Sequence, residues 1–324
     1  MKSSRNKTID FTPEDGSEYL ERCLSPNAPI RLDDMENRVI LGDAFAVMPL
    51  LPRAFADLLI VDPPYNLDKD FGGSRFGRKS DADYARYTAA WLDAALPLLK
   101  PTASVYVCCD WRSGTAVIPV LTQRLNVRNR ITWQREKGRG AKANWKNGME
   151  DIWFATVSAD YTFNLDAVRL RRRVIAPYKE NGQPKDWEQT ETGNFRGTCP
   201  SNFWDDISIP YWSMAENTAH PTQKPEKLLA KLLLASSNAG DLVFDPFLGS
   251  GTTAVAAKKL GRRFVGIEQS RQYCAWAQKR LESAEHDRTI QGYSDGVFWE
   301  RNSRPGARGN SAAARKTACK TRTP

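Results

Sequence analysis

Two short segments carry residues that can do chemistry, and the first is Asp62-Pro63-Pro64-Tyr65. It follows the apolar run 58–61, which predicts a buried strand that stops at Asp62. Two prolines in a row fix their φ angles and make the turn stiff. The Asp62 carboxylate and the Pro63 carbonyl can accept the hydrogens of an exocyclic amine, while the Tyr65 ring stacks on its heterocycle. The alternative is a strand-ending turn with an incidental tyrosine.

The second segment is a glycine-rich turn, residues 245–252, between an apolar strand and a helix. A further short strand ends in Glu268, 19 residues after Gly249. This order of strand, turn, helix, strand and acid is typical of a nucleotide-type cofactor site, where glycines let the ligand approach the backbone and the acid binds ribose hydroxyls. The turn lacks the third glycine of the dinucleotide fingerprint and the Gly-Lys-Ser/Thr of a P-loop. An ordinary tight turn would not explain the position of Glu268.

Alternating strands and helices must position these segments. Apolar periodicity predicts strands near 39–41, 56–61, 104–109, 131–133, 150–156, 242–244 and 264–267. It predicts helices near 44–51, 81–99, 113–125, 224–234, 252–260 and 270–284. The alternation favours a mostly parallel sheet covered on both faces. Ligands of such sheets bind beyond the carboxyl ends of the strands, where both segments fall.

Together, these motifs resemble the amino-group DNA methyltransferases that use S-adenosylmethionine. Asp-Pro-Pro-Tyr precedes Asp-Pro-Phe-Leu-Gly-Ser-Gly-Thr-Thr, an order that resembles the permuted β class. Residues 220–225 and 37–43 match two further elements of that class, so the resemblance covers about residues 37–285. It implies a Rossmann-like class I methyltransferase fold of the α/β type. The expected sheet is circularly permuted, seven-stranded and mostly parallel, with an inserted target-recognition region.

The resemblance implies direct methyl transfer to the amine of a base flipped out of duplex DNA. Its catalytic residues would be Asp62, Pro63, Pro64 and Tyr65. Asp62 and the Pro63 carbonyl would accept the amine hydrogens and stabilise the developing positive charge, without a covalent intermediate. Asp43 is expected on the cofactor adenine, Glu268 on the ribose, and residues 222–224 over the amino-acid end. The full expected cofactor set is Asp43, Asp62, Thr222, Gln223, Lys224, Asp245, Phe247, Gly249, Ser250, Gly251, Thr252 and Glu268.

Three basic runs, 69–79, 128–146 and 169–185, flank these motifs and predict contact with the DNA backbone. For any single run, a solvated face is the alternative. Trp133 would form a second wall for the flipped base, with a core tryptophan as the alternative. The candidate DNA-binding residues are Lys69, Arg75, Arg78, Lys79, Trp133, Arg135, Lys137, Arg139, Lys142, Arg171, Arg172 and Arg173. Candidates for base contacts are Asn202, Trp204, Asp205 and Asp206.

Composition shifts divide the chain into five parts. Residues 1–36 are a polar N-terminal lead-in, 37–164 the catalytic half of the methyltransferase domain, 165–218 the target-recognition insertion and 219–300 the cofactor-binding half. Residues 301–324 form a basic tail that is expected to be disordered. The tail has seven Lys and Arg residues and no acid, so only +2 of the net charge of +9 belongs to the rest. Local clusters are therefore better evidence for DNA binding than total charge.

Composition also excludes several classes of protein. With 324 residues and 41% hydrophobic residues, the chain can bury a large core, and its apolar runs are far shorter than a membrane span of about 18 residues. No secretory signal follows Met1, so the expected location is the cytoplasm, on the nucleoid when DNA is bound. Six scattered cysteines and two histidines predict no metal site and no disulfide framework.

Asp62 favours adenine N6 as the target, because aspartate at this motif position is more typical of the adenine enzymes and serine of the cytosine enzymes. Cytosine N4 is the alternative within the family. A catalytically silent DNA-binding protein and an RNA or small-molecule methyltransferase are alternatives of other classes. Double-stranded DNA is the expected partner. The enzyme would be an orphan or part of a restriction-modification system with a cognate restriction endonuclease, and a homodimer is a further expectation.

Overall fold

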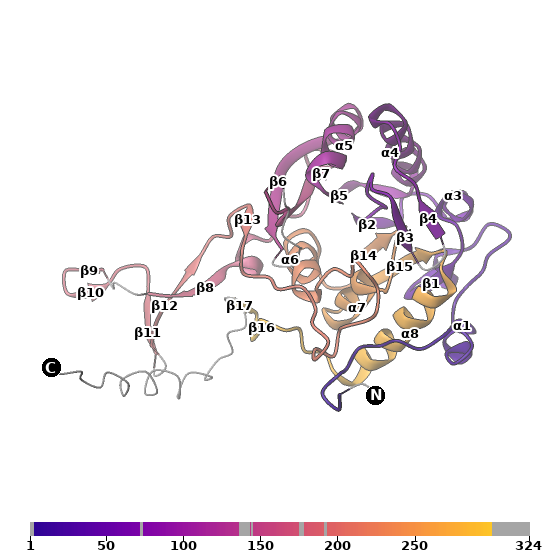
Figure 1. Cartoon of the computed structure of the whole chain (residues 1–324). Helices are drawn as coiled ribbons and strands as arrows, with labels where there is room; N and C mark the ends of the chain where they lie inside the picture. Colours follow the sequence, from indigo (N-terminus) through magenta and orange to yellow (C-terminus); the bar gives the residue numbers. More distant parts are fainter. Residues whose placement is uncertain are drawn as a thin grey trace.

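An eight-stranded sheet with helices on both faces dominates the computed structural model (Figure 1). The structure describes residues 3–71, 74–135, 143, 145–174, 178–190 and 193–299, so the tail 301–324 lies outside it. Within these residues no helix is both long and apolar enough to cross a membrane.

The sheet has the order β1 (Arg38–Leu41), β15 (Arg263–Glu268), β14 (Leu242–Asp245), β2 (Ala56–Val61), β5 (Leu99–Cys109), β7 (Met149–Thr156), β6 (Asn126–Gln134), β13 (Phe203–Trp204). The first five strands are parallel, and β7 is antiparallel to both of its neighbours. A mostly parallel sheet is therefore confirmed. The predicted count of seven was one short in the described chain, because the two-residue β13 pairs with β6 and is too short to leave a pattern.

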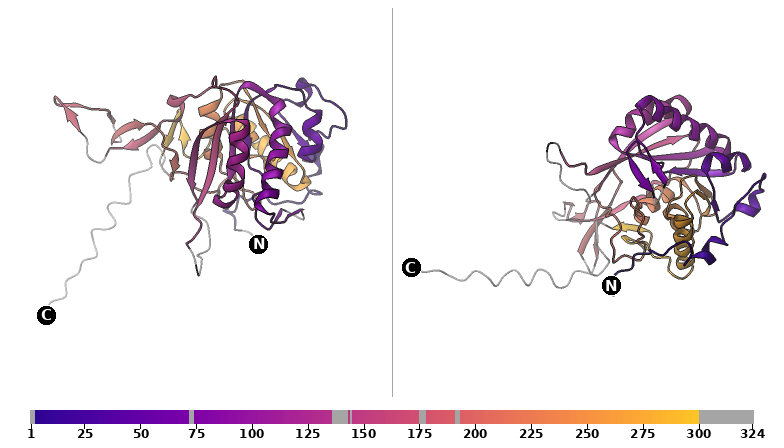
Figure 2. Two further views of the ribbon diagram at one scale, coloured as in Figure 1. Left: turned by 90° about the horizontal axis from the view of Figure 1, so that it is seen from above. Right: turned by 45° about the vertical axis from the view of Figure 1, so that its right-hand side comes forward.

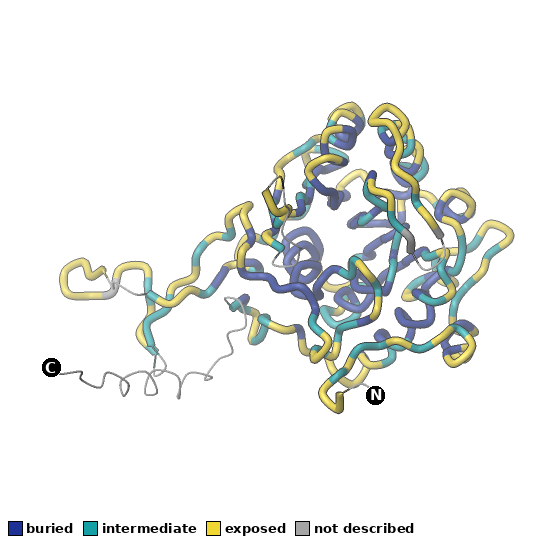
Figure 3. The backbone as a smooth tube through the Cα atoms, viewed as in Figure 1, coloured by how far each residue is buried: buried dark blue, intermediate teal, exposed yellow. Residues whose placement is uncertain are grey.

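Helices cover the two faces of this sheet in separate groups. One apolar core packs α3 (Ala44–Val47), α4 (Asp81–Ala95) and α5 (Trp111–Arg124) on one face. The other packs α6 (Glu226–Ser236), α7 (Thr252–Lys259) and α8 (Arg271–His286) on the opposite face. The strands are buried between the layers, as the dark blue centre of Figure 3 shows. Side-chain oxygens of Ser80, Asp110 and Ser270 cap the N-termini of α4, α5 and α8.

A second sheet combines the insertion with the end of the described chain. Its order is β11 (Glu188–Thr190), β12 (Gly193–Thr198), β8 (Leu170–Arg173), β17 (Val297–Trp299), β16 (Tyr293–Ser294). Strand β17 pairs parallel with β8, across the predicted boundary between the insertion and the cofactor half. A small core that includes Phe298 and Ala230 fixes this sheet against α6. Figure 2 shows the sheet projecting from the main body, with the hairpin β9 (Lys179–Glu180) and β10 (Gln183–Pro184) at its far end.

The basic run after the Asp-Pro-Pro-Tyr turn forms a hairpin of β3 (Lys69–Phe71) and β4 (Ser74–Phe76). Asn66 anchors its base, because its amide nitrogen donates to the Lys79 carbonyl at 3.0 Å and its amide oxygen accepts from the Lys79 N–H at 2.7 Å. Five short helices complete the description: α1 (Ser17–Leu20), α2 (Leu32–Met35), η1 (Met48–Leu50), η2 (Leu96–Leu98) and η3 (Leu165–Val168).

Candidate active site

The two chemical segments meet at the carboxyl edge of the main sheet. Strands β2 and β14 are direct neighbours, with Leu58 opposite Val243 and Leu59 opposite Phe244. Their carboxyl ends therefore place Asp62 and Asp245 at one edge. A cavity of about 370 Å³ lies there, and both turns line it.

The Asp-Pro-Pro-Tyr turn is held from several sides. Tyr84 donates its hydroxyl to the Pro64 carbonyl at 3.0 Å. Tyr65 Oη lies 2.9 Å from Asp62 Oδ1 and 3.2 Å from Glu150 Oε2, so its proton can go to either carboxylate. Burial, and then the charge of Asp62, raises the pKa of Tyr65 well above its ordinary value, so the phenol stays protonated.

Lys224 places an ammonium directly against this turn. Its Nζ donates to Asp62 Oδ2 at 2.6 Å and to Tyr65 Oη at 3.1 Å, and it lies 3.2 Å from Glu150 Oε2. The Lys224 side chain is only 7% exposed. Burial by itself would lower the pKa of Lys224, but the carboxylates of Asp62 and Glu150 outweigh burial and raise it. The lysine is therefore a buried cation held between two acids.

Glu150 is a site residue that the sequence analysis missed. It lies in β7, is 3% exposed, and forms an ion pair with Arg135 as well as with Lys224. The signal was present, since Glu150 alternates with Ile152 and Phe154 on the buried face of this strand. Arg135, expected on DNA, points to this acid.

Both glycines that flank Ser250 have positive φ angles, which glycine adopts more readily than other residues. Gly249 has φ +55° and Gly251 has φ +85°, conformations that L side chains rarely adopt. A Cβ on Gly251 would also lie 2.6 Å from the Cβ of Ala277 in α8. The turn therefore presents bare backbone to the cavity and packs closely on α8.

Backbone amides hold the two acids of this turn. Glu268 Oε2 accepts from the Gly249 N–H at 2.8 Å, and Oε1 accepts from the Ser270 N–H at 2.7 Å. Asp245 Oδ1 accepts from the Phe247 N–H at 3.0 Å. Asp245 is 3% exposed, and burial raises the pKa of its carboxyl to about 7.

The segment 216–224 borders the turn on another side. His220 packs edge-on against Tyr273, with ring centroids 4.4 Å apart, and its Nε2 lies 3.3 Å from where a Cβ on Gly249 would be. Burial, and then Lys224, lowers the pKa of His220 to about 3, so it stays neutral. Thr222 and Gln223 line the cavity, but the Gln223 amide is bonded to Thr218 and to the Glu216 carbonyl. Its role in the structure is to shape this segment.

Other predicted residues are spread unevenly around the cavity. Asp43 lines it and caps α3 by accepting from the Ala46 N–H at 3.1 Å. Lys69 and Arg75 of the β3–β4 hairpin also line it. Exposed members of the DNA-binding set are Arg75, Arg78, Lys79, Arg172 and Arg173. Arg171 packs over the rings of Phe195 and Trp299. Lys137, Arg139 and Lys142 lie outside the described residues.

Trp133 was wrongly placed among the DNA contacts, and its core alternative is correct. It is 2% exposed, and its indole N–H donates to the Ile207 carbonyl at 2.9 Å. Trp204 and Asp206, expected on bases, are also buried. Asp206 pairs with Lys227 and Lys231 of α6, whereas Asn202 and Asp205, the other two candidates for base contacts, are exposed.

The residues around the cavity fit S-adenosylmethionine. Carboxylates of Asp43, Asp62, Asp245 and Glu268 line it with the bare Gly249 backbone, and Phe247 adds an aromatic surface. Acids suit a cofactor that carries a sulfonium, an ammonium, an amine and ribose hydroxyls. Among the described residues no cluster of three or more His, Cys, Asp or Glu side chains could hold a metal ion.

Comparisons with known proteins agree with this chemistry. A family model for N6/N4 methyltransferases, described as DNA methylase, matches residues 56–279. The type II methyltransferase M.HpaI of Haemophilus parainfluenzae is 33% identical over 252 residues, which cover 77% of this chain and 75% of that protein. The DNA adenine methyltransferase YhdJ of Escherichia coli (strain K12) is 32% identical over 265 residues, which cover 80% of this chain and 87% of that protein.

Solved structures share the fold. The PvuII DNA methyltransferase, described as cytosine-N4-specific, has a TM-score of 0.58 at 16% identity, and the match covers 82% of this chain and 92% of that protein. Other structures of this fold are complexes with S-adenosylmethionine, the cofactor of the reaction. The family match over most of the chain and two relatives above 30% identity lead to one conclusion: the chain belongs to the N6-adenine/N4-cytosine family of DNA methyltransferases.

Proposed function

We propose that this enzyme methylates the exocyclic N6 of adenine at a specific site in duplex DNA, by base flipping and direct in-line transfer. One observation carries the proposal: Asp62 lies at the cavity in a rigid turn and binds a cationic nitrogen, Lys224 Nζ, at 2.6 Å. The target amine becomes cationic as it gains a methyl group. A carboxylate placed to hold an ammonium therefore stabilises the transition state more than the neutral ground state.

In this proposal the residues of the turn act together. S-adenosylmethionine would supply the electrophilic methyl group: its carbon–sulfur bond breaks as the carbon–nitrogen bond forms, S-adenosylhomocysteine leaves, and the methylated amine gives up one proton to Asp62 or to solvent. Asp62 and the Pro63 carbonyl accept the amine hydrogens, and the ring of Tyr65 stacks on the flipped base. Lys224 must give up part of its hold on Asp62 as the amine arrives, and Glu150 and Tyr65 remain to hold the lysine. Pro64, fixed by Tyr84, keeps this geometry unchanged through the transfer.

The cofactor is proposed to lie along the glycine-rich turn. Backbone and side chains of this turn would bind it, with Glu268 on the ribose and Asp43 on the adenine amine. Residues 222–224 would close the amino-acid end. The proposed set is Asp43, Asp62, Thr222, Gln223, Lys224, Asp245, Phe247, Gly249, Ser250, Gly251, Thr252 and Glu268. The supporting observation is that this set, apart from Gly251, lines one cavity.

DNA is proposed to lie across the same edge, with the β3–β4 hairpin beside the flipped base. Lys69 and Arg75 line the cavity, and Arg78 and Lys79 are exposed next to it. Cations there would hold the phosphates that flank the flipped nucleotide. The similarity to a type II methyltransferase supports a restriction-modification role with a cognate endonuclease, and an orphan role is the alternative.

Adenine is favoured over cytosine by Asp62 and by the relative whose name states adenine. The fold does not separate the two targets, since the cytosine-N4-specific structure shares it. The test is to incubate the protein with labelled S-adenosylmethionine and plasmid DNA, then to identify the modified base by mass spectrometry. N6-methyladenine is expected, and N4-methylcytosine would overturn the adenine assignment. Unlabelled DNA, with Asp62→Ala binding DNA as well as the wild type, would indicate a silent DNA-binding protein.

A further inference from the structure

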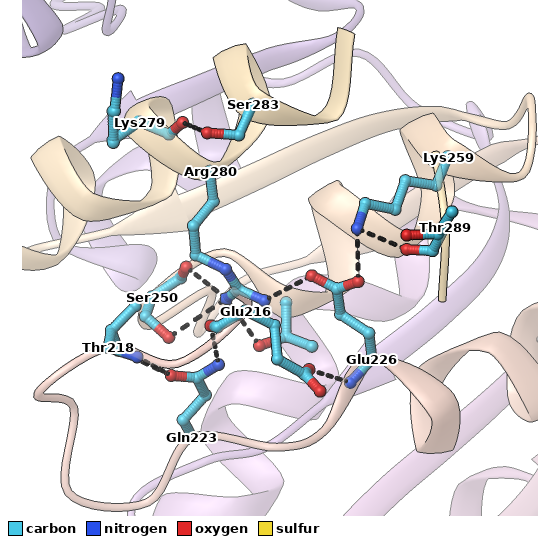
Figure 4. Close-up of polar contacts among 11 residues, drawn as sticks. Glu216, Thr218, Gln223, Glu226, Ser250, Lys259, Lys279, Arg280, Ser283 and Thr289 are labelled. Atoms are coloured by element: carbon cyan, nitrogen blue, oxygen red, sulfur yellow. Dashed lines mark hydrogen bonds and ion pairs between the residues drawn. The ribbon is translucent and has the colours of Figure 1, made fainter. Parts of the chain in front are cut away.

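An ionic cluster of Glu216, Glu226, Lys259 and Arg280 lies behind the glycine-rich turn (Figure 4). The Arg280 and Glu226 side chains are only 2% and 4% exposed. None of the four is among the described residues that line the cavity. The proposed mechanism therefore does not use them directly.

Arg280 of α8 contacts two separate parts of the site with one guanidinium. Its Nη1 donates to the Ser250 carbonyl at 2.8 Å and to Thr252 Oγ1 at 2.9 Å, in the glycine-rich turn. Its Nη2 donates to Glu226 Oε1 at 3.0 Å. A planar guanidinium offers donors in fixed directions, and a lysine ammonium at this position would be a single point charge.

Glu226, the second contact of Arg280, lies two residues after Lys224 in the chain. Glu226 is the first residue of α6, and its backbone N–H donates to Glu216 Oε2 at 2.7 Å. Gln223 donates from its amide to the Glu216 carbonyl at 2.6 Å. The rigid Pro225 separates Lys224 from Glu226. The position of Glu226 therefore determines where the Lys224 backbone enters the site.

Stability alone is a weak reason for this arrangement. Burying an ion pair usually costs about as much free energy as it returns, and apolar residues of equal volume are often as stable. What apolar residues would not supply is a directional link from the Ser250 carbonyl to Glu226. Lys259 holds the other oxygen of Glu226, at 2.7 Å, and also donates to the Thr289 carbonyl. Among the described residues, the hydrogen bonds of Lys259 go to Glu226 and Thr289, whereas Arg280 also binds the turn.

We propose that Arg280 is a positioning residue that links the cofactor turn to the segment carrying Lys224, so that cofactor binding and the geometry at Asp62 are set together. The proposal rests on the proposed roles of Asp62 and Lys224. It extends them, because it assigns a function to a buried side chain that touches neither the base nor the cofactor. A turn displaced from Arg280 would bind cofactor less well and would also move Lys224 relative to Asp62.

The test compares Arg280→Met with Lys231→Met. Each variant removes one of two cations from a buried carboxylate, Glu226 in the first case and Asp206 in the second. Calorimetry should show S-adenosylmethionine affinity reduced roughly ten- to hundredfold for Arg280→Met, the range expected for charged hydrogen bonds, and unchanged for Lys231→Met. The kcat at saturating cofactor and DNA should also fall for Arg280→Met. Arg280→Lys, which is expected to fold even if the methionine variant does not, should recover part of the affinity.

Two outcomes would overturn the proposal. Wild-type cofactor affinity in Arg280→Met, or in Arg280→Lys where the methionine variant does not fold, with only a melting temperature lowered as in Lys231→Met, would reduce Arg280 to a structural residue. Weaker cofactor binding with kcat unchanged at saturation would remove the link to Lys224. Because the calorimetry needs no DNA, failure of the proposed function itself would appear differently, as a wild-type protein that binds S-adenosylmethionine but methylates no DNA.

Discussion

The two turns at the carboxyl edge of the sheet hold their carboxylates in opposite ways. Side chains from distant segments hold Asp62, namely Lys224 and, through Tyr65, Glu150. Backbone amides hold the acids at the glycine-rich turn, as Gly249 does for Glu268 and Phe247 for Asp245. A side-chain partner can be exchanged for a substrate group, whereas a backbone amide stays in place. The Asp-Pro-Pro-Tyr turn is therefore suited to exchanging partners, and the glycine-rich turn to keeping its shape.

The largest expected effect comes from removing the negative charge of Asp62, the acid that is held by side chains. Asp62→Asn keeps the size of the side chain but loses its negative charge, so it should lower the single-turnover rate by about a thousandfold. Calorimetry should show a much smaller change in cofactor affinity. Asp93→Asn is the control, because it breaks an exposed pair with Arg124 and should leave the rate unchanged. Rates within tenfold of wild type for Asp62→Asn would contradict a charge-stabilising role.

Removing the partner of Asp62 tests the same turn through stability. Lys224→Met leaves two carboxylates close together with Arg135 as the remaining neighbour of Glu150, and it should cost about 3 kcal/mol in the free energy of unfolding. Urea denaturation measures this value. Lys100→Met, which breaks a more exposed pair with Asp57, should cost about 1 kcal/mol or less. Equal losses in both variants would mean that Lys224 is an ordinary surface cation.

The backbone-held turn should respond to shape rather than to charge. Gly251→Ala puts a Cβ at φ +85° and 2.6 Å from Ala277, so it should cost about 2 kcal/mol of stability and displace the turn. Cofactor affinity should fall with it. Gly240→Ala has a similar φ of +84° but open space around its Cβ, and it separates strain from the clash. If both variants bind cofactor equally well, close packing on α8 is not needed for the site.

A pH dependence of stability, spread over several pH units, is expected to originate at Asp245. Burial raises the pKa of this carboxyl from 3.8 to about 7, so between these values the folded state keeps a proton that the unfolded state has lost. The contribution of Asp245 to stability is therefore complete below about pH 4, is lost by up to about 1.4 kcal/mol per pH unit as the pH rises to 7, and then levels off.

Asp245→Asn should flatten this slope for the cofactor-free protein while still accepting from the Phe247 N–H. Glu216, whose pKa burial also raises to about 7, contributes with the same sign and remains in the variant. The slope should therefore shrink without vanishing, as thermal unfolding between pH 4 and 8 can measure. An unchanged slope would show that Asp245 ionises as freely in the folded protein as in the unfolded chain.

The same contrast explains what the sequence could predict. The glycine-rich turn was identifiable because strand, turn, helix and Glu268 follow one another within a short stretch, and the family match confirms the fold that it implied. Glu150 was missed because it meets Tyr65 only through the antiparallel register of β7 on β5, 85 residues away. Trp133 was misplaced for a related reason. Its aromatic ring and basic neighbours suggested DNA, but its inward direction follows from the pairing of β6 with β7.

The second sheet has a consequence for how the protein is made. During synthesis, the insertion strand β8 leaves the ribosome long before β17, its parallel partner, at residues 297–299. Until then one edge of β8 has no partner within this sheet, a state that favours pairing with other chains. The last strand among the described residues thus completes a region begun near the middle of the chain. A shortened protein without the basic tail should therefore still include Trp299. One that ends at α8 would lack β17, and its insertion should be prone to aggregation.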